Sequence, residues 1–470
     1  MFTNSTTSRN DPAHAAPVAL RSERAAVEGV ADLKKILLCH NVYQQAGGED
    51  QSFEQEARLL ESRGHEVVRF SVHNNVIDSM SHWQVARRAV WNSEAYAELR
   101  TLIRDQRPDV MHCTNTFPLV SPAAYYAARK EGVPVVQSLR NYRLLCPAAF
   151  LLRDQRVCED CLGKSIPWPA VLHGCYRGSR LGSAAVSTML SVHRMIKTWT
   201  KAIDRYFALT EFSRQKFIEG GLPAERIAVK PNFIDPDPRR GSGSGGYALF
   251  VGRLSTEKGV DTLLEAWTRL NRAVPLEIIG DGPLAEQVRE AAARQANITW
   301  HGKLASQETV ERIGAAACLV MPSIWYECFP RTILEALAKG TPVVASRIGS
   351  MIELVTEGVT GAHFEAGNAS ELAATVERLF ANPESLTAMR PAARQEFVEN
   401  YTAESNYETL IDIYRQARDL SRTDRSVRAP RDVEAPTKQR SGSAQQVSAR
   451  HANLRESSRE KAVATRSSSS

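Results

Sequence analysis

The chain has 470 residues, of which 43% are hydrophobic and 24% charged, as in an ordinary soluble globular protein. That length predicts two domains. Because no apolar run approaches the ~20 residues that span a bilayer and no secretory signal opens the chain, we expect a cytoplasmic protein without membrane-spanning segments.

Most of the formal net charge of +6 lies at the C-terminal end. Residues 419–470 hold eleven Lys and Arg against six Asp and Glu, a balance of +5, so the rest of the chain is close to neutral. The segment has few aliphatic and no aromatic residues, which predicts a disordered basic tail. We expect no nucleic-acid partner. The tail either attracts anionic lipid headgroups weakly or is a solvated extension.

The first half alternates strand and helix patterns. Residues 1–31 are polar and predict a disordered N-terminus. From Lys34, KKILLCH predicts a buried strand, Ser52–Arg63 a helix and HEVVRFSV a second strand. Further strands are expected at RPDVMHCTN, VPVVQSL and RYFALT. This alternation favours a parallel sheet with helices on both faces, in a Rossmann-like domain over residues 32–236.

A second alternating series follows a linker. Residues 237–246, within DPDPRRGSGSGG, predict a flexible connection. Strands are then expected at YALFVGRL, LEIIGDG, ITWHG, CLVMPS and TPVVAS, with helices near Val260–Asn271 and Leu284–Gln295, in a domain over 247–400. Residues 401–418 predict a closing helix that crosses back onto the first half. The chain therefore reads as two doubly wound halves.

The segment VGRLSTEKG places two cations on one loop. Gly252 ends a strand, and Arg253 and Lys258 follow it within a short turn. A guanidinium fork and an ammonium on one loop suit a diphosphate. The alternative is a surface loop with solvated charges.

The segment ECFPRTILEALAKG combines two carboxylates with a helix start. Pro330 suits the first turn of a helix, whose free N–H groups, those of Arg331 and Thr332 among them, form an anion site. Glu327 precedes that turn and Glu335 lies about one turn further in. Carboxylates on both sides of an anion site favour the hydroxyls of a sugar nucleotide.

The segment IIGDGPL is a strand that runs into a Gly-Pro turn. Gly280, Asp281 and Gly282 form the start of that turn. The turn either packs beside a nucleobase or simply connects a strand to a helix.

Together, GRLSTEKG, IGDGPL and the paired glutamates followed by KGTPVVAS are similar to the donor domain of retaining GT-B glycosyltransferases of the group 1 family, glycosyltransferase family 4. HNVYQQAGGED resembles that family's glycine-rich loop, and ALTEFSRQKFIEGGLP and VKPNFID resemble the end of its first domain. The similarity covers Lys34 to Tyr414. It implies an α/β fold of GT-B architecture, with two doubly wound Rossmann-like domains facing each other across a cleft.

The resemblance also implies roles for individual residues. Arg253 and Lys258 would hold the diphosphate of a nucleotide sugar, Glu335 its ribose and Glu327 the hydroxyls of the transferred sugar. The remaining donor-binding candidates are the glycines that approach the phosphates, the Gly-Pro turn and the helix start: Gly47, Gly48, Gly252, Gly280, Asp281, Gly282, Phe329, Pro330, Arg331 and Thr332.

Two positions in the first half depart from the family pattern. Relatives commonly carry a histidine where this chain has Arg140, just before the intact NYRLLCP, and often H-x-H-N where it has His112 and Thr114. Arg140 cannot act as a base because it stays protonated. It either neutralises phosphate or holds an acidic acceptor, marks a weakened enzyme, or is structural. His112 and His40 end strands and are either structural or catalytic candidates.

Four cysteines cluster in the loop-rich segment 143–180, at Cys146, Cys158, Cys161 and Cys175. A C-x2-C pair with two further thiols nearby is typical of structural zinc, and the alternative is four unligated thiols. The only D-x-D, Asp235 to Asp237, falls in the linker. We therefore expect transfer that needs no metal ion.

The sequence predicts a retaining, hexosyltransferase-type enzyme that needs no cofactor besides its nucleotide-sugar donor. By the resemblance, the acceptor is a glycan or lipid-linked hydroxyl in bacterial cell-envelope or exopolysaccharide synthesis. Ser191–Ile203 mixes basic and apolar residues and either contacts the inner membrane surface or packs within the domain. The alternative function is a catalytically weakened nucleotide-sugar-binding or scaffold protein. An epimerase would need further carboxylates in the first half.

Overall fold

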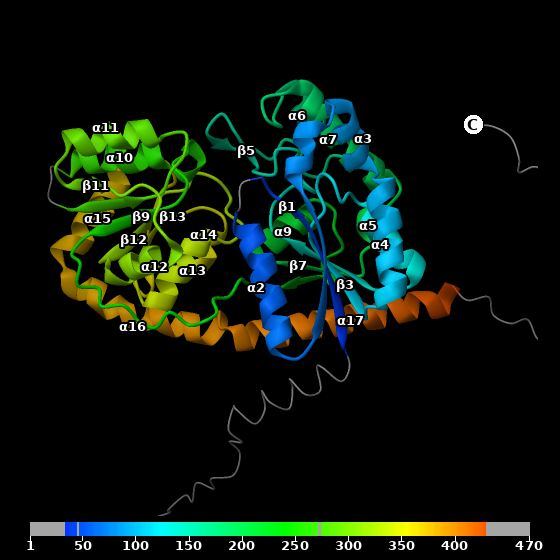
Figure 1. Ribbon diagram of the computed structural model, residues 1–470. Coiled ribbons are helices and arrows are strands. Elements are labelled where there is room, and N and C mark those ends of the chain that lie inside the picture. Colours follow the sequence, from blue (N-terminus) through cyan, green and yellow to red (C-terminus); the bar gives the residue numbers. More distant parts are fainter. Residues whose placement is uncertain (1–32, 45–46, 271–273, 429–470) are drawn as a thin grey trace, which may run out of the picture. The chain divides into compact units, whose positions relative to one another are not determined.

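The computed structural model describes residues 33–44, 47–270 and 274–428. Disordered ends are expected at 1–31 and 419–470, and of these, residues 1–31 and 429–470 lie outside the described residues. The described residues up to Arg425 belong to one compact unit, and every contact given below lies within it. The fold consists of two parallel sheets of six strands each, with helices packed on both faces (Figure 1). The α/β architecture predicted from the sequence is confirmed.

The first sheet belongs to the first domain, which we call the acceptor domain after its expected role, and has the strand order 2-1-3-4-7-8. Its strands are, in that order, β2 (Glu66–His73), β1 (Lys35–Val42), β3 (Val110–Asn115), β4 (Val135–Leu139), β7 (Arg205–Ala208) and β8 (Ile227–Val229). The helices of this domain are α2 (Gly48–Ser62), α3 (His82–Val90), α4 (Ser93–Gln106), α5 (Ala123–Glu131), α6 (Trp168–Leu172), α7 (Arg180–Met195), α8 (Thr198–Lys201) and α9 (Glu211–Glu219). A two-stranded antiparallel hairpin, β5 (Leu152–Arg153) and β6 (Arg156–Val157), lies within the cysteine-rich segment.

The second sheet belongs to the second domain, which we call the donor domain after its expected role, and has the order 11-10-9-12-13-14. Its strands are β11 (Ile298–Trp300), β10 (Leu276–Ile279), β9 (Ala248–Val251), β12 (Cys318–Met321), β13 (Val343–Ser346) and β14 (Gly361–Phe364). Its helices are α10 (Val260–Arg269), α11 (Ala285–Arg294), α12 (Ser306–Ala315), α13 (Arg331–Lys339), α14 (Ser350–Leu354), α15 (Ala369–Ala381) and α16 (Pro383–Asn400). β9 and β12 are neighbours in this sheet although two strands separate them in sequence, so the strand order reverses there.

The connection between the sheets is held against the donor domain. Gly241 N–H donates to the Lys339 carbonyl at 2.9 Å, and Gly243 N–H donates to the Gly314 carbonyl at 2.9 Å. The Arg390 guanidinium reaches the carbonyls of Gly241 and Gly314 at 3.1 Å each. Glycine permits this close approach, because a Cβ at Gly241 would lie 2.3 Å from the Gly314 backbone. The expected flexible linker is thus packed along α12 and α13, and the expected domain bounds stay predictions.

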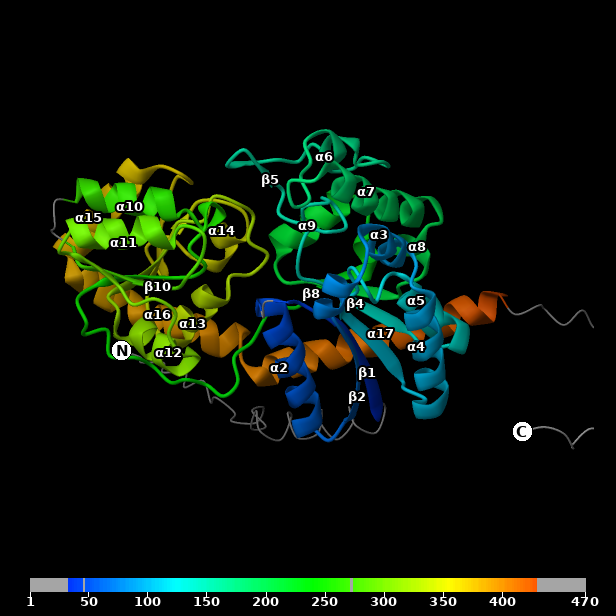
Figure 2. The same cartoon turned by 45° about the horizontal axis from the view of Figure 1, so that its top comes forward.

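The closing helix α17 (Ala403–Arg428) returns to the first sheet, as expected (Figure 2). The Tyr407 hydroxyl bonds His65 Nε2 at 2.8 Å, and the Tyr414 hydroxyl bonds His112 Nδ1 at 2.9 Å. Arg63 donates to both carboxylate oxygens of Glu404 at 2.6 Å. α17 extends ten residues past its expected end at 418, into residues 419–428, which the sequence assigned to the disordered tail. Sequence periodicity could not detect this extension, because the added residues have no apolar pattern.

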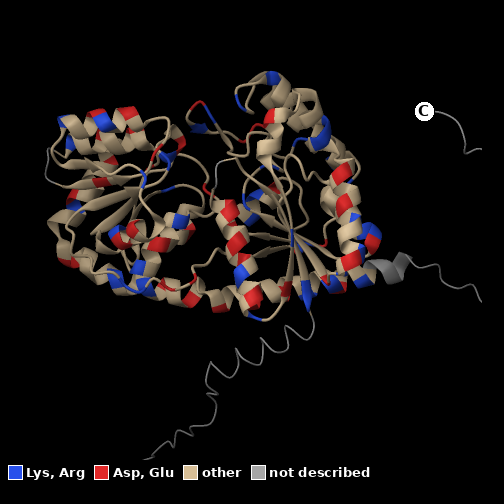
Figure 3. Cartoon of the chain, viewed as in Figure 1, with Lys and Arg blue, Asp and Glu red and all other residues tan. Residues whose placement is uncertain are grey.

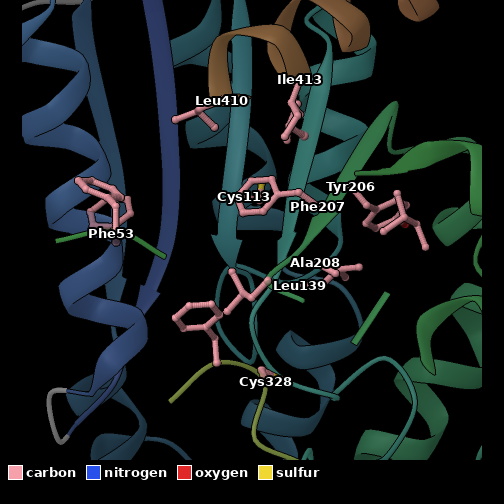
Figure 4. Packing of buried hydrophobic residues seen from close by; sticks show 14 of the residues in the cluster. Phe53, Cys113, Leu139, Tyr206, Phe207, Ala208, Cys328, Leu410 and Ile413 are labelled. Carbon is pink, nitrogen blue, oxygen red and sulfur yellow. The ribbon is translucent and has the colours of Figure 1, made fainter. Parts of the chain in front are cut away.

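The hydrophobic core of the acceptor domain continues into a donor-domain loop. Phe207 and Ala208 of β7 and Leu139 of β4 are buried, and Cys328 belongs to the same cluster (Figure 4). The Thr210 hydroxyl donates to the Cys328 carbonyl at 3.4 Å. The loop before α13 is therefore seated against the carboxyl ends of the acceptor-domain strands.

Gly259 fixes the loop after β9 against the loop after β12. Its φ is +72°, in the left-handed region, and a Cβ there would lie 1.8 Å from the Pro322 carbonyl oxygen. The Ile324 N–H also donates to the Glu257 carbonyl at 3.0 Å. These contacts hold the two loops together.

We predict that Gly259→Ala lowers the melting temperature by about 4 °C or more, because a left-handed alanine and a backbone clash add to about 3 kcal/mol or more. Gly302→Ala is the matched control, since Gly302 has φ +67° but a Cβ there would meet nothing within 4 Å. In thermal unfolding, Gly302→Ala measures the cost of the left-handed backbone alone, and the additional shift in Gly259→Ala measures the cost of the clash. Equal shifts would show that the two loops do not need this close contact.

Candidate active site

The strand-order reversal of the donor domain brings two loops together. Residues 252–259 follow β9 and residues 322–330 follow β12, at the carboxyl ends of adjacent parallel strands. In open α/β sheets, ligands bind at this position. Both loops contain residues that the sequence predicted as donor-binding.

Lys258 and Glu327 form an ion pair between these loops. The Lys258 ammonium donates to Glu327 Oε1 at 2.6 Å, and its nitrogen lies 5.4 Å from the centroid of the Trp325 ring. The Ser323 hydroxyl and the Trp325 indole N–H donate to the same oxygen at 2.9 and 3.0 Å. Glu327 is only 6% exposed. The carboxylate is thus fixed in position by three donors before any ligand binds.

Arg253 differs from Lys258. Its side chain is exposed and forms no ion pair with any residue that the structure describes. Gly252, just before it, has no positive φ, and a Cβ would lie 3.5 Å from the Phe250 ring, an ordinary contact. The guanidinium at this loop therefore stays available to an anion from solvent.

Helix α13 begins as the sequence predicted, with Pro330 as its N-cap and Arg331 as its first residue. Arg331 donates to Glu335 Oε1 at 3.0 Å and to Gln55 Oε1 of α2 at 2.8 Å, so it links the two domains. Burial raises the pKa of Glu335, against the lowering effect of Arg331. The Thr332 hydroxyl contacts the Met321 sulfur at 3.2 Å.

The Gly-Pro turn after β10 packs on the loop after β9. Gly280 and Gly282 have φ of +144° and +159°, and Cβ atoms there would lie 1.8 Å from the Gly252 carbonyl and 2.5 Å from that of Leu254. The Leu254 N–H donates to the Asp281 carbonyl at 3.0 Å. The glycines therefore serve close backbone packing beside the cationic loop.

The N-terminus of α2 lies at the end of β1. Gly47 is its N-cap, and its N–H donates to Asp50 Oδ2 at 2.8 Å. Asp50 Oδ1 bonds His40 Nε2 at 2.8 Å. A Cβ at Gly48 would meet nothing within 4 Å. His40 is therefore a buried partner of Asp50, which favours the structural role for this histidine.

Arg140 belongs to a buried ionic network that the sequence did not predict. It donates to Glu56 Oε1 at 2.8 Å and to Asn232 Oδ1 at 2.6 Å. Lys230 donates to the same Glu56 oxygen at 2.7 Å. Burial alone would raise the pKa of Glu56, but Lys230 and Arg140 lower it to about 2. The network of two cations and one carboxylate carries a net positive charge.

His112 lies at the edge of this network. It is fully buried, its Nδ1 bonds the Tyr414 hydroxyl, and that nitrogen is 4.0 Å from Glu56 Oε2. Burial lowers the pKa of His112 to about 4, so the ring is neutral at pH 7. His112 and His40 both face α2 but contact different residues there.

A pocket lies at the carboxyl ends of β3 and β4. Arg140 and Thr114, the two departures from the family pattern, both line it. The Thr114 hydroxyl and Arg140 Nε are buried and have no hydrogen-bond partner among the described residues. The other lining side chains include Asn115, Gln137, Ser138, Asn141 and Arg143.

The four cysteines at Cys146, Cys158, Cys161 and Cys175 are free thiols. Burial, and then proximity to Cys146, raises the pKa of Cys161 to about 12, and Cys175 and Cys158 also contribute. Within the described part of the chain, no set of three or more His, Cys, Asp or Glu side chains has the geometry of a metal site. The zinc site therefore stays a prediction.

Two family models match this chain. The "Glycosyl transferases group 1" model matches residues 239–396, and the "Glycosyl transferase 4-like domain" model matches residues 47–232. This chain belongs to the group 1 glycosyltransferases. The first model covers every strand of the second sheet, and the second model covers every strand of the first sheet except β1, so both halves of the fold support the assignment.

Similar proteins and solved structures agree with this assignment. The glycogen synthase of Mycobacterium tuberculosis is 28% identical over 76% of this chain and 88% of the synthase. The GDP-mannose-dependent alpha-mannosyltransferase of Corynebacterium glutamicum is 27% identical over 56% of each chain. Anabaena Alr3699/HepE in complex with UDP and glucose superposes with a TM-score of 0.56 at 19% identity, over 84% of this chain and all of that chain. The last comparison confirms the GT-B fold.

Sequence reasoning missed four members of the Arg140 network, namely Glu56, Lys230, Asn232 and Tyr414. One signal was present, because Glu56 lies three residues after Phe53 and four before Leu60, on the apolar face of α2. A carboxylate on such a face needs a buried partner. The partners themselves are far away in sequence.

The buried His112 predicts a pH dependence of stability. The pKa is about 4 in the folded chain and 6.5 without burial, so the unfolded state takes up the proton first as the pH falls. The contribution of His112 to the free energy of unfolding should therefore decline by about 3 kcal/mol between pH 6.5 and pH 4. His112→Asn should remove that part of the decline in denaturant unfolding, and the exposed His82→Asn should not. Parallel curves for His112→Asn and wild type would contradict this.

For the cysteine cluster, we predict about one zinc per chain in metal analysis of the purified protein. Zinc would hold the thiols as thiolates, which the raised pKa values of Cys158, Cys161 and Cys175 otherwise disfavour. Cys158→Ser with Cys161→Ser should abolish zinc binding, whereas Cys318→Ala, at a buried position in β12, should retain it. Metal-free wild type would leave the unligated-thiol alternative.

Proposed function

We propose that this chain is a retaining glycosyltransferase that moves a hexosyl group from a nucleotide-diphospho-sugar to an acceptor hydroxyl. The Lys258–Glu327 ion pair beside the start of α13 carries the proposal. It combines a cation for the diphosphate with a carboxylate that is already oriented by Ser323 and Trp325. Such preorganised charge is the usual means of stabilising a leaving group.

The donor would bind across the three loops of the second sheet. Arg253 and Lys258 would hold the diphosphate, with the first-turn N–H groups of α13. Glu335 would accept from the ribose hydroxyls, and Glu327 from the transferred sugar. The exposed Arg253 supports this assignment, since its guanidinium is uncommitted among the described residues.

The names of related proteins support a nucleotide-sugar donor. One relative is named for GDP-mannose and one neighbouring structure holds UDP and glucose. Because these two names differ in base and in sugar, they do not identify the base or the sugar of this chain's donor. We infer a glycan or lipid-linked acceptor in cell-envelope or exopolysaccharide synthesis, from the family resemblance.

In the proposed step, the bond between the anomeric carbon and the diphosphate breaks and a bond to the acceptor oxygen forms on the same face of the sugar. The proton of the acceptor hydroxyl passes to the leaving diphosphate, so no protein base is required. Two cations and a helix N-terminus supply positive charge at the leaving group. We propose on this basis that transfer needs no divalent metal.

Arg140 would act as a positioning residue. Its contacts with Glu56 and Asn232 support a role in holding the carboxyl ends of the strands in place. The pocket that it lines would receive the acceptor. The acceptor hydroxyl would then approach the donor from the first domain.

The test is release of nucleoside diphosphate from a panel of UDP-, GDP- and ADP-sugars. Wild type should release it from one donor, and Lys258→Ala or Glu335→Gln should lower the rate by about 100-fold or more. Arg294→Ala, at an exposed position on α11 in the same domain, should leave the rate unchanged. NMR of the product should show the donor's anomeric configuration, and chelator should not alter the rate.

An inverted product would contradict the retaining mechanism, and a rate lost on chelation would contradict metal independence. Unchanged rates in both Lys258→Ala and Glu335→Gln would remove the donor-site assignment. Donor binding by wild type with turnover only in Arg140→His would instead support a binding protein.

A further inference from the structure

The acceptor domain carries a group of exposed apolar side chains around α6 and α7. Among the described residues, six of the exposed large hydrophobic side chains fall within this one stretch of chain. They are Ile166 (59% exposed), Trp168 (57%), Leu172 (54%), Leu181 (85%), Met195 (75%) and Ile196 (48%). We call these six residues the α6–α7 surface. Single exposed hydrophobics are common, but a group of this size marks an interaction site.

The residues of this surface are brought together by α7. The segment from Lys164 to Tyr176 runs antiparallel along the helix. Arg194 donates to the Lys164 carbonyl, Ser187 to the Pro167 carbonyl at 3.3 Å, and the Tyr176 N–H to Ser183 Oγ at 2.8 Å. Figures 1 and 2 both show α6 beside α7.

One face of α7 is exposed along its whole length. Leu181, Thr188 and Met195 are all exposed and follow one another at intervals of seven residues. At ~100° per residue, the first and last lie only about 40° apart around the axis, and about 21 Å apart along it. The helix therefore lies along the surface of the domain with an uncovered stripe.

A neighbouring helix carries a further exposed aromatic side chain. Helix α3 packs on α7, and the Val90 carbonyl bonds His193 Nε2 at 2.9 Å. Trp83 of α3 is 79% exposed. Tryptophan is enriched where an apolar surface meets lipid headgroups.

The stretch of chain that forms this surface carries charges of one sign. Residues 161–203 contain no Asp or Glu, and no red appears on that stretch of ribbon in Figure 3. The nearest acidic neighbours in sequence have other partners, since Glu159 pairs with Lys216 and Asp160 with Arg153. Six cations lie in the stretch, and none forms an ion pair with a described residue: Lys164, Arg177, Arg180, Arg194, Lys197 and Lys201.

Three of these cations gather around one pocket. Lys164, Arg194 and Lys197 line it, together with Leu144 and Trp199. The last two residues also line the pocket that contains Arg140. A headgroup-sized anion at the surface would therefore lie next to the proposed acceptor pocket.

We propose that the α6–α7 surface lies on a membrane rich in anionic lipids, with its apolar side chains in the headgroup region and its cations on lipid phosphates. A second copy of this chain is a poorer occupant, because a symmetric contact would set six cations against six. Of the apolar residues in the Ser191–Ile203 stretch that the sequence singled out, Met195 and Ile196 belong to the α6–α7 surface, whereas Trp199 and Ile203 are buried.

The test is sedimentation of the full chain with vesicles of phosphatidylcholine alone and of phosphatidylcholine with phosphatidylglycerol. Wild type should bind the anionic vesicles and bind more weakly as salt increases. Leu181→Ser with Met195→Ser should weaken binding by roughly tenfold or more, through lost apolar burial. Arg180→Gln with Lys201→Gln should weaken it by about fivefold for each cation.

The matched control is Val359→Ser with Val398→Ser, at positions 48% and 44% exposed in the donor domain, which should bind as wild type does. All variants keep the basic tail. Undiminished binding by both surface variants would place the contact elsewhere and overturn the proposal. Failure of wild type to bind anionic vesicles, or light scattering that shows a dimer lost in the surface variants, would overturn it as well.

Discussion

The elements of the acceptor domain are held together around one buried charge, the carboxylate of Glu56. This side chain belongs to α2, and its cations come from the ends of β4 and β8, as Arg140 and Lys230. His112 of β3 lies beside it and is bonded in turn to Tyr414 of α17. Removing one partner of such a network leaves an uncompensated buried charge, at a cost of about 3–5 kcal/mol. The network therefore fixes the relative positions of α2, of the strands β3, β4 and β8, and of the returning helix α17.

The loops of the donor domain hold opposite charges close together. Gly259 and Gly280 let the loop backbones approach to distances that a Cβ would forbid. The pair of Lys258 and Glu327 is then neutral as a unit, while Arg253 stays exposed. A ligand that brings both phosphates and hydroxyls satisfies every one of these groups, whereas a simple anion satisfies only the cations. This asymmetry is why the geometry favours a sugar nucleotide.

The two domains meet through a few polar contacts beside a small apolar core. Arg331 reaches Gln55 of α2, and the Glu353 carboxylate accepts from the N–H groups of Glu211 and Phe212 at the start of α9, each at 3.0 Å. An acidic side chain at a helix N-terminus satisfies donors that the helix leaves unpaired. No helix in the described part of the chain has the length and apolar content to cross a bilayer.

The sequence by itself determined the alternation of strands and helices, the second β/α series and the donor loops, because these depend on local periodicity, on glycine and proline, and on residues close together in the chain. The start of α13 at Pro330 is the clearest case. Only the tertiary structure decided what Arg140 touches, since Glu56 and Asn232 are 84 and 92 residues away. It alone also gathered the α6–α7 surface, because exposure depends on which helix face the fold covers. Short-range patterns specify elements, whereas buried charge networks and exposed faces arise from contacts between segments that no local pattern links.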